Sequence, residues 1–252
     1  MRVRARLSVN NMRPLGRGRK IAAWIFFPIA LAILLSLGTW QVQRLAWKEG
    51  LIASIEERRH ADPLDVPQIE ALVAEGKPID YRAARASGRF LNDKERHFFA
   101  TFEGRSGFYI YTPLALSDGR YLFVNRGFVP YEMKDQQTRT AGLLDGAQTV
   151  TGLARQKLTE KPGSLVPEND LAKDIFYWKD LDAMAETVGL DQEKVLPFFL
   201  DADATLVNGG WPVGGVTQIE MPNNHLQYAV TWYGLAAALM VVGGMALFRR
   251  KD

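Results

Sequence analysis

One histidine of this chain stands where a metal ligand at a membrane surface would be placed. His225 follows the turn-forming Pro222-Asn223-Asn224 and directly precedes a long apolar run. Imidazole is the commonest metal ligand among side chains, and an ionisable group at membrane depth usually serves function. The pattern predicts a helix whose first turn holds His225, with Asn223 or Asn224 as its N-cap. Three residues extend this face along the helix: Tyr228, Ala229 and Trp232.

A second group of candidate residues stands at the end of the first apolar run. Its members recur at spacings of three, four and seven and so share one helix face: Trp40, Gln41, Arg44, Trp47 and Lys48. Two explanations stay open. An aromatic belt with cations that extend to the headgroups gives the same pattern. Alternatively, the two cations meet a carboxylate-bearing ligand while the tryptophans stack on its ring.

The two faces, if they meet, would enclose an apolar slot with one imidazole and two cations at its mouth. A heme needs an axial ligand, apolar walls and charge partners for its propionates. Gln227 and Thr231 would be costly against lipid, so we expect them on a packed face. Small residues would let a helix or a flat ligand approach closely: Gly234, Ala236, Ala237, Ala238, Gly243 and Gly244.

The elements that must position these residues are two apolar runs, each with the ~20 residues that a helix needs to cross a bilayer. They predict five segments: a basic tail at 1–20, a transmembrane helix at 21–40, an exported domain at 41–225, a second transmembrane helix at 226–248 and a tail at 249–252. The first tail carries seven Lys/Arg and no acid, and the last carries three Lys/Arg and one acid. The positive-inside rule therefore places both termini in the cytoplasm.

The central domain would then be periplasmic. No small-x-small cleavage site follows the first run, which favours a retained anchor. We expect a multi-pass protein of a bacterial inner membrane, and favour a mitochondrial inner membrane less because the basic leader is short. Between the tails, 21 basic residues stand against 27 acidic ones, so the basic isoelectric point describes the tails and does not indicate nucleic-acid binding.

The composition also limits which metal sites and catalytic sites the chain can form. The chain has no cysteine, so disulfides and thiolate sites are excluded and neither copper nor zinc is expected. His60 lies in a charged run expected on a solvated helix face, and His97 is expected at the edge of a turn. Ser106 is interpreted as a turn serine, and no phosphate loop or nucleophile elbow is present. We therefore expect no enzyme.

The pattern between the two apolar runs predicts a β domain with short helices. Helices are expected over 45–60, 67–76 and 180–188, and strands over 81–90, 97–103, 107–116, 121–130, 149–158 and 197–202. Asp118-Gly119 is the clearest hairpin turn. The predicted fold class is an α+β membrane protein, in which two transmembrane helices flank one mainly antiparallel, barrel-like exported domain.

Three blocks resemble the surfeit-locus-one (Surf-one) family of cytochrome c oxidase assembly factors. They are Leu37-Gly38-Thr39-Trp40-Gln41-Val42-Gln43-Arg44-Leu45-Ala46-Trp47-Lys48, Phe123-Val124-Asn125-Arg126-Gly127-Phe128-Val129-Pro130 and Asn223-Asn224-His225-Leu226-Gln227-Tyr228-Ala229-Val230-Thr231-Trp232-Tyr233-Gly234-Leu235-Ala236. The order of the blocks and the two-anchor topology match from residue 21 to residue 248. One departure is Phe128, where family members often have tryptophan.

The resemblance implies a non-catalytic factor that binds heme a transiently and helps its insertion into the large subunit of cytochrome c oxidase. On that analogy His225 is an axial ligand of the heme iron. Heme a synthase is a candidate second partner, and membrane lipid surrounds the helices. The contacts of Arg44 and Lys48 with propionates, and of the aromatic residues Trp40, Trp47, Tyr228 and Trp232 with the ring, rest on spacing and charge.

Two alternatives stay open. A heme-independent chaperone would bind and stabilise the nascent oxidase subunit, with His225 as a packing residue. A membrane-anchored enzyme would need convergent ionisable groups far from both runs. Asn125-Arg126-Gly127 is either a partner surface or a structural feature, in which a buried arginine bridges strands and a loop.

Overall fold

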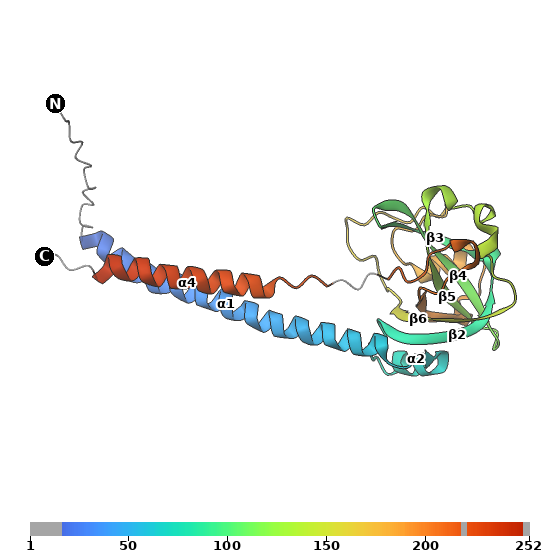
Figure 1. The fold of residues 1–252 in the computed structure, drawn as a ribbon, viewed down its shortest axis with the longest axis horizontal. Helices are drawn as coiled ribbons and strands as arrows, with labels where there is room; N and C mark the ends of the chain where they lie inside the picture. Colours follow the sequence, from blue (N-terminus) through green and yellow to red (C-terminus); the bar gives the residue numbers. More distant parts are fainter. Residues whose placement is uncertain (1–16, 218–220, 249–252) are drawn as a thin grey trace, which may run out of the picture. The chain divides into compact units, whose positions relative to one another are not determined.

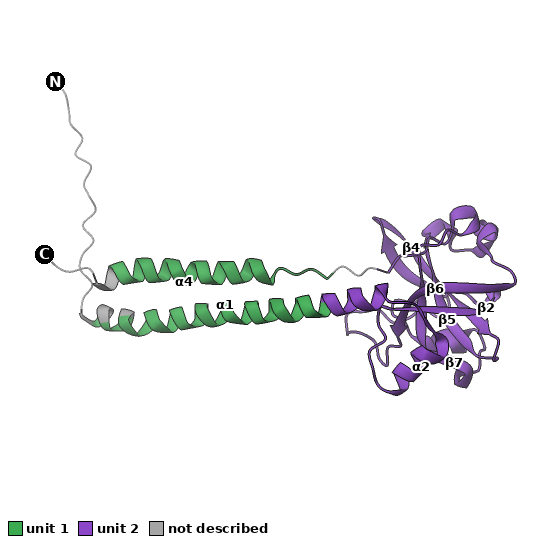
Figure 2. Ribbon diagram, turned by 60° about the horizontal axis from the view of Figure 1, so that its bottom comes forward, with its two compact units in different colours: residues 1–51, 221–252 green, residues 52–220 purple. Residues whose placement is uncertain are grey.

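The computed structural model describes residues 17–217 and 221–248, and it divides into two compact units (Figures 1 and 2). Unit 1 comprises residues 1–51 and 221–252, and unit 2 comprises residues 52–220. We name the described part of unit 1 the helix pair and unit 2 the barrel domain. Of the basic tail predicted at 1–20, residues 1–16 lie outside the described residues, as does the tail at 249–252, whereas residues 17–20 are helical.

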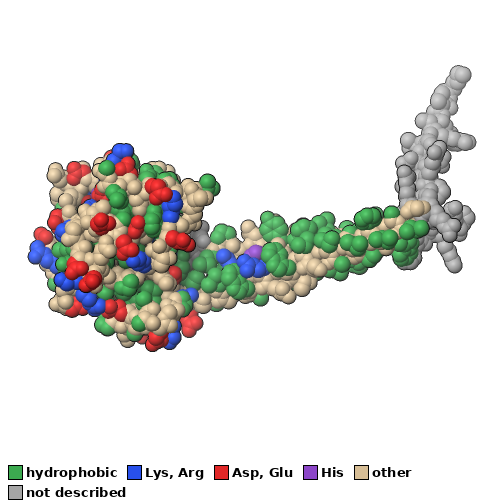
Figure 3. Space-filling model, turned by 180° about the vertical axis from the view of Figure 1, so that it is seen from behind, with side chains coloured by type: hydrophobic (Ala, Val, Ile, Leu, Met, Phe, Trp, Pro, Cys, Tyr) green, Lys and Arg blue, Asp and Glu red, His purple; other side chains and the backbone are tan. Residues whose placement is uncertain are grey.

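The helix pair consists of α4 (His225–Phe248) and the part of α1 (Arg17–His60) up to residue 51. Both helices are long and apolar enough to cross a membrane. Hydrophobic side chains cover much of their outer surface (Figure 3). The helix predicted over 45–60 is confirmed, and it is continuous with the first apolar run.

Five strands close a barrel in unit 2. Strand β2 pairs with β6 on one side and with β4 on the other, so β2, β6, β7, β5 and β4 form a ring. Outside the ring, β1 pairs with β2, and β3 pairs with β4. The strands are β1 (Leu64–Asp65), β2 (Arg82–Phe90), β3 (Arg96–Phe102), β4 (Arg105–Leu116), β5 (Tyr121–Pro130), β6 (Ala147–Gln156) and β7 (Val195–Ala202).

The sheet is mainly antiparallel, as predicted, with one parallel pair inside the ring and one outside it. These are β5 with β7 and β1 with β2. Parallel neighbours need a crossover of about a dozen residues or more. The chain between β5 and β7 supplies such a crossover, because it contains β6 and the helix α3 (Leu181–Thr187).

The predicted elements each overlap an observed one, and the strand at 121–130 coincides with β5. Helix α2 (Val66–Ala74) and α3 fall within or next to their predicted ranges, and the Asp180 side chain caps α3 by accepting from the Ala183 amide at 3.1 Å. Five short 3-10 helices complete the part of the fold that the structure describes: η1 (Asn92–Lys94), η2 (Tyr131–Met133), η3 (Gln136–Gly142), η4 (Gln192–Lys194) and η5 (Asn208–Gly210).

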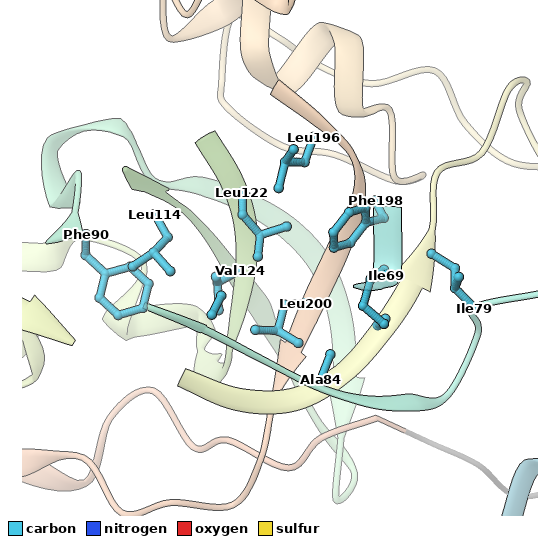
Figure 4. Close-up of a cluster of buried hydrophobic side chains, with 12 residues drawn as sticks. Ile69, Ile79, Ala84, Phe90, Leu114, Leu122, Val124, Leu196, Phe198 and Leu200 are labelled. Carbon is cyan, nitrogen blue, oxygen red and sulfur yellow. The ribbon is translucent and has the colours of Figure 1, made fainter. Parts of the chain in front are cut away.

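Successive residues of β7 pack into two different hydrophobic clusters. Phe198 and Leu200 pack with Ile69 in the cluster of Figure 4. Phe199 belongs to a second cluster, which includes Met184 of α3. Successive side chains of a strand point to opposite faces, so both faces of β7 are buried. A strand buried on both faces has a continuous apolar sequence instead of an alternating one.

Three local predictions have clear outcomes. The Asp118-Gly119 hairpin turn is confirmed, with Gly119 at φ 83° and the Leu116 amide 2.9 Å from the Arg120 carbonyl oxygen. His60 is exposed at the end of α1, as predicted. Ser106 lies within β4 instead of a turn, because the chain already reverses at Glu103, with φ 50°, and the following glycine.

His97 lies in β3, in line with the strand predicted over 97–103, but it is buried instead of standing at the edge of a turn. It is 7% exposed, with its Nδ1 2.6 Å from Asp174 and its Nε2 3.1 Å from the Lys134 carbonyl oxygen and 3.3 Å from Glu95. Both ring nitrogens face acceptors, which the imidazolium satisfies by donating twice. Burial favours a lower pKa for His97, but the hydrogen bonds and charges of Asp174 and Glu95 outweigh it, so the net pKa is raised.

This arrangement predicts that the barrel domain is most stable on the acid side of neutrality. A raised pKa in the folded chain contributes stability that is complete below the ordinary value of 6.5 and is lost as pH rises through the folded pKa. We expect the urea midpoint of the full chain, followed by tryptophan fluorescence, to fall from pH 6 to pH 9. His97→Gln should cost about 2 kcal/mol at pH 6 and flatten this dependence. His60→Gln is the matched control, and an equal slope in both variants would contradict the assignment.

Candidate ligand site at the start of helix α4

The first turn of α4 places His225 against α1 within the helix pair. His225 Nδ1 lies 2.7 Å from the side-chain oxygen of Gln41, which is only 8% exposed. The Tyr228 amide donates to the Asn224 carbonyl at 3.2 Å, so Asn224 holds the N-cap position through its backbone. Asn223 Oδ1 is buried and has no hydrogen-bond partner among the described residues.

The Gln41 contact determines which nitrogen of His225 carries the proton. The amide oxygen of Gln41 can only accept a hydrogen bond, so Nδ1 must donate. In the neutral ring this leaves the lone pair on Nε2. Metal-binding histidines commonly have this arrangement, in which the other ring nitrogen donates to an oxygen that fixes the tautomer. The lone pair of Nε2 is therefore available to bind a metal.

Close packing of the two helices holds this contact in register. A Cβ atom on Gly38 would lie 2.8 Å from the Tyr233 ring, and the Tyr233 hydroxyl is 3.1 Å from that of Thr39. Ala229 and Ala236 of α4 are almost completely buried. Small residues at such positions let helix backbones approach closely in an apolar medium.

The remaining predicted residues lie on the same two helices, and the structure does not bring them into contact with His225. Trp40, Trp47 and Tyr228 are each about half exposed, at 51%, 54% and 53%. The Arg44 guanidinium carbon lies 4.3 Å from the Trp47 ring centroid, so these two residues are paired. Two other predicted residues, Lys48 and Trp232, are partly buried. Within the described parts of the chain, no hydrogen bond or ring contact joins these side chains to the imidazole.

An apolar groove of about 590 Å³ lies farther along the helix pair. Its first α4 residue, Leu235, follows His225 by ten positions, which corresponds to about 15 Å along the helix axis. The groove is therefore separate from the imidazole. Its walls are Ala30, Ile33, Leu34, Leu235, Ala238, Leu239 and Val242.

One expectation about the second run is wrong, and another holds only for some of its residues. Gln227 and Thr231 are exposed and not packed, and the Thr231 hydroxyl donates to the Gln227 carbonyl at 2.9 Å. This bond within the helix satisfies the hydroxyl without a partner helix. Of the small residues, Gly243 approaches α1, because a Cβ there would lie 2.3 Å from Phe27, whereas Gly234 and Gly244 have open space.

The sequence places Gln41 on the correct helix face but assigns it no role, and its hydrogen bond with His225 is not predicted. The signal that could have found it is the position of Gln41 in an apolar environment, where a polar side chain requires a specific partner. The side chains present fit a heme chemically: an imidazole with a free Nε2 lone pair, exposed aromatic surfaces and a fixed cation.

The fold defines a class of protein in which one closed β-barrel domain stands, along the sequence, between two helices that are long and apolar enough to cross a membrane. The second of these helices carries an imidazole with its Nε2 lone pair free. The model of the SURF1 family matches residues 28–237, so the chain belongs to the SURF1 family. It is 40% identical to Surfeit locus protein 1 of Rattus norvegicus over 230 residues, which cover 85% of this chain and 71% of that protein. It is 37% identical to Surfeit locus protein 1 of Homo sapiens, over 85% of this chain and 74% of the relative.

The tautomer can be tested without any bound ligand. In the full chain in detergent, with ¹⁵N-labelled histidine, we expect the His225 Nδ1 resonance in the protonated range and that of Nε2 in the unprotonated range. Gln41→Leu removes the acceptor and should shift both toward the averaged values of an unconstrained ring. Gln43→Leu, at an exposed position two residues along α1, should leave them unchanged. Identical spectra for the two variants would contradict the role of Gln41.

The packing at Gly38 predicts a second change in the same measurement. Gly38→Leu should displace Tyr233 and separate Gln41 from His225, which reproduces the shift seen in Gln41→Leu. Gly50→Leu is the control, because no atom lies within 4 Å of a Cβ built at that position of α1. An unchanged His225 spectrum in Gly38→Leu would show that the register does not depend on this contact.

Proposed function

We propose that this chain is an assembly factor for a heme–copper terminal oxidase of the cytochrome c oxidase type, which binds heme a and helps its insertion into the large catalytic subunit. The observation that carries the proposal is the hydrogen bond between Gln41 and His225, because it leaves Nε2 available as an axial ligand. Membership of the SURF1 family supports an assembly role in general terms. Heme a and its transfer are the specific part of the proposal.

Each remaining side chain of the proposed site has a role that its chemistry allows. Arg44, held over Trp47, and the partly buried Lys48 would meet the propionates. The exposed aromatic faces of Trp40 and Tyr228 would cover the ring, together with Trp47 and Trp232. When bound, the heme supplies an iron that accepts a nitrogen lone pair. The chain itself binds, orients and releases, so the proposed function is not enzymatic.

The proposed setting is a membrane. Two apolar helices support insertion, and the basic tails of the sequence favour cytoplasmic termini with a periplasmic barrel domain. We place the chain in a bacterial inner membrane. The proposed partners are the large oxidase subunit, which receives the heme, and heme a synthase, which would provide it.

A second candidate function is a heme-independent chaperone for the nascent oxidase subunit. The same hydrogen bond favours it in a different way, because a bond between α1 and α4 can serve packing alone. In this case the exposed tryptophans and the apolar groove of the helix pair would contact helices of the subunit. The two candidates differ in whether His225 is needed for a bound chromophore.

The deciding experiment is the optical spectrum of the full chain purified from cells that make heme a. We expect a Soret band and an α-band in the unsubstituted chain and their loss in His225→Ala. His60→Ala, which changes an exposed histidine at the end of α1, should keep both bands. Gln41→Leu should weaken heme retention by about 10-fold to 100-fold, as expected for loss of the group that orients a ligand.

A colourless unsubstituted chain would contradict heme binding and favour the chaperone. Bands that persist in His225→Ala would contradict ligation by this residue. The content of assembled oxidase in cells carrying His225→Ala provides a separate readout. Normal oxidase content together with a colourless chain would indicate that the chain acts through its contacts with the oxidase subunit and not through a bound heme.

A further inference from the structure

Arg126 is the buried arginine that the Asn125-Arg126-Gly127 block anticipated. It lies in β5 with 4% exposure and bridges two other segments, as its structural interpretation predicts. Its Nη1 donates to Asn92 Oδ1 at 3.1 Å and its Nη2 to the Gly142 carbonyl at 2.5 Å. The guanidinium carbon lies 4.6 Å from the Phe90 ring centroid.

The charge of Arg126 is nevertheless not neutralised. All three contacts of the guanidinium are with uncharged groups, and no carboxylate among the described residues forms an ion pair with it. Glu95, which is close enough to influence it, already pairs with Arg139 and His97. Burial lowers the pKa of Arg126 to about 10. A buried cation without a counter-ion is costly, and a carboxylate would relieve that cost.

Arg126 forms part of the wall of a cleft of about 310 Å³ in the barrel domain. This volume is near the lower limit of small-molecule sites, which begin at about 300 Å³. Three residues of the cleft wall have side chains that can form hydrogen bonds: Gln148, Thr149 and Thr151. Three others are apolar: Leu144, Leu206 and Val207. Leu206 is 94% exposed.

One acidic residue also lines this cleft. Asp203 is exposed to solvent, and one of its carboxylate oxygens already accepts from the backbone amide and the hydroxyl of Thr205, at 2.9 and 2.5 Å. Solvent screens an exposed charge strongly, whereas the buried guanidinium is screened much less. The buried charge therefore dominates recognition within the cleft.

We propose that this cleft binds a short aliphatic carboxylate, with the carboxylate on Arg126 and the aliphatic part against Leu144, Leu206 and Val207. Arginine presents paired donors that match a carboxylate better than any other side chain. The hydroxyl and amide groups of Thr149, Thr151 and Gln148 can complete the hydrogen bonds. The ligand is either a free acid or the C-terminal residue of a peptide, which share this chemistry. This site is independent of the proposed heme function.

The test uses 4-methylpentanoate and its neutral amide as probes of the full chain in detergent, with dissociation constants from ligand-observed NMR. We expect saturable binding of the acid and at least ~10-fold weaker binding of the amide. Arg126→Met should abolish binding, and Arg126→Lys should weaken it because the paired donors are lost.

Arg126 variants can fail to fold, so a variant at an exposed position provides the decisive test of carboxylate binding. Leu206→Glu removes part of the apolar wall, which weakens binding of both probes, and adds a negative charge at the cleft, which should weaken binding of the acid by about 10-fold more than binding of the amide. Leu165→Glu is the matched control, since Leu165 is 97% exposed and is not part of the cleft wall. Competition by a short peptide ending in a leucine carboxylate would identify a chain terminus as the ligand, and its failure would leave the free acid.

Equal affinities for the acid and the amide would overturn the role of Arg126. Absence of saturable binding would overturn the site, and equal effects of Leu206→Glu and Leu165→Glu would show non-specific attraction to the surface. None of these outcomes depends on whether the chain binds heme.

Discussion

The pairing of β2 with β4 is the constraint on which the barrel domain depends. It joins Gly88 to Leu116 and Phe90 to Leu114, and so closes the ring of five strands. A Cβ atom at position 88 would lie 2.3 Å from the Ala115 carbonyl oxygen, so this closure requires glycine. Closing the ring removes two exposed strand edges from the barrel. It also places Phe90 at the end of β2, where its ring meets the guanidinium of Arg126.

The fold could be predicted further than the site. Turn residues and apolar runs mark element boundaries, so β5 and the Asp118-Gly119 hairpin followed from local sequence. A barrel-like sheet was predicted, but the β2–β4 pair that closes it and the parallel β5–β7 pair could not be, because these contacts join strands far apart in the chain. The burial of His97 was missed because the polar residues before it resemble a loop, whereas the partners that bury it, Asp174 and the Lys134 carbonyl, are distant in sequence.

For the candidate site, the periodicity of the two apolar runs identified the helix faces and selected His225. The partner of the histidine depends on how α1 and α4 pack, which periodicity does not determine. The packing residues are small ones such as Gly38 and Ala229, which have no chemistry of their own. The clustering expected of the aromatic and basic residues also depends on that packing, and the exposed positions of Trp40 and Trp47 follow from it.

Gln41 and His225 are separated by 184 positions in the sequence. The acceptor that fixes the histidine tautomer is therefore synthesised before the strands of the barrel, and the histidine itself after them. A nascent or truncated chain that has only α1 contains the acceptor without the ligand. The hydrogen bond between Gln41 and His225 can therefore form only after the described strands of the barrel have been synthesised. Synthesis of α4 acts in this way as a checkpoint on when the two helices can first pair.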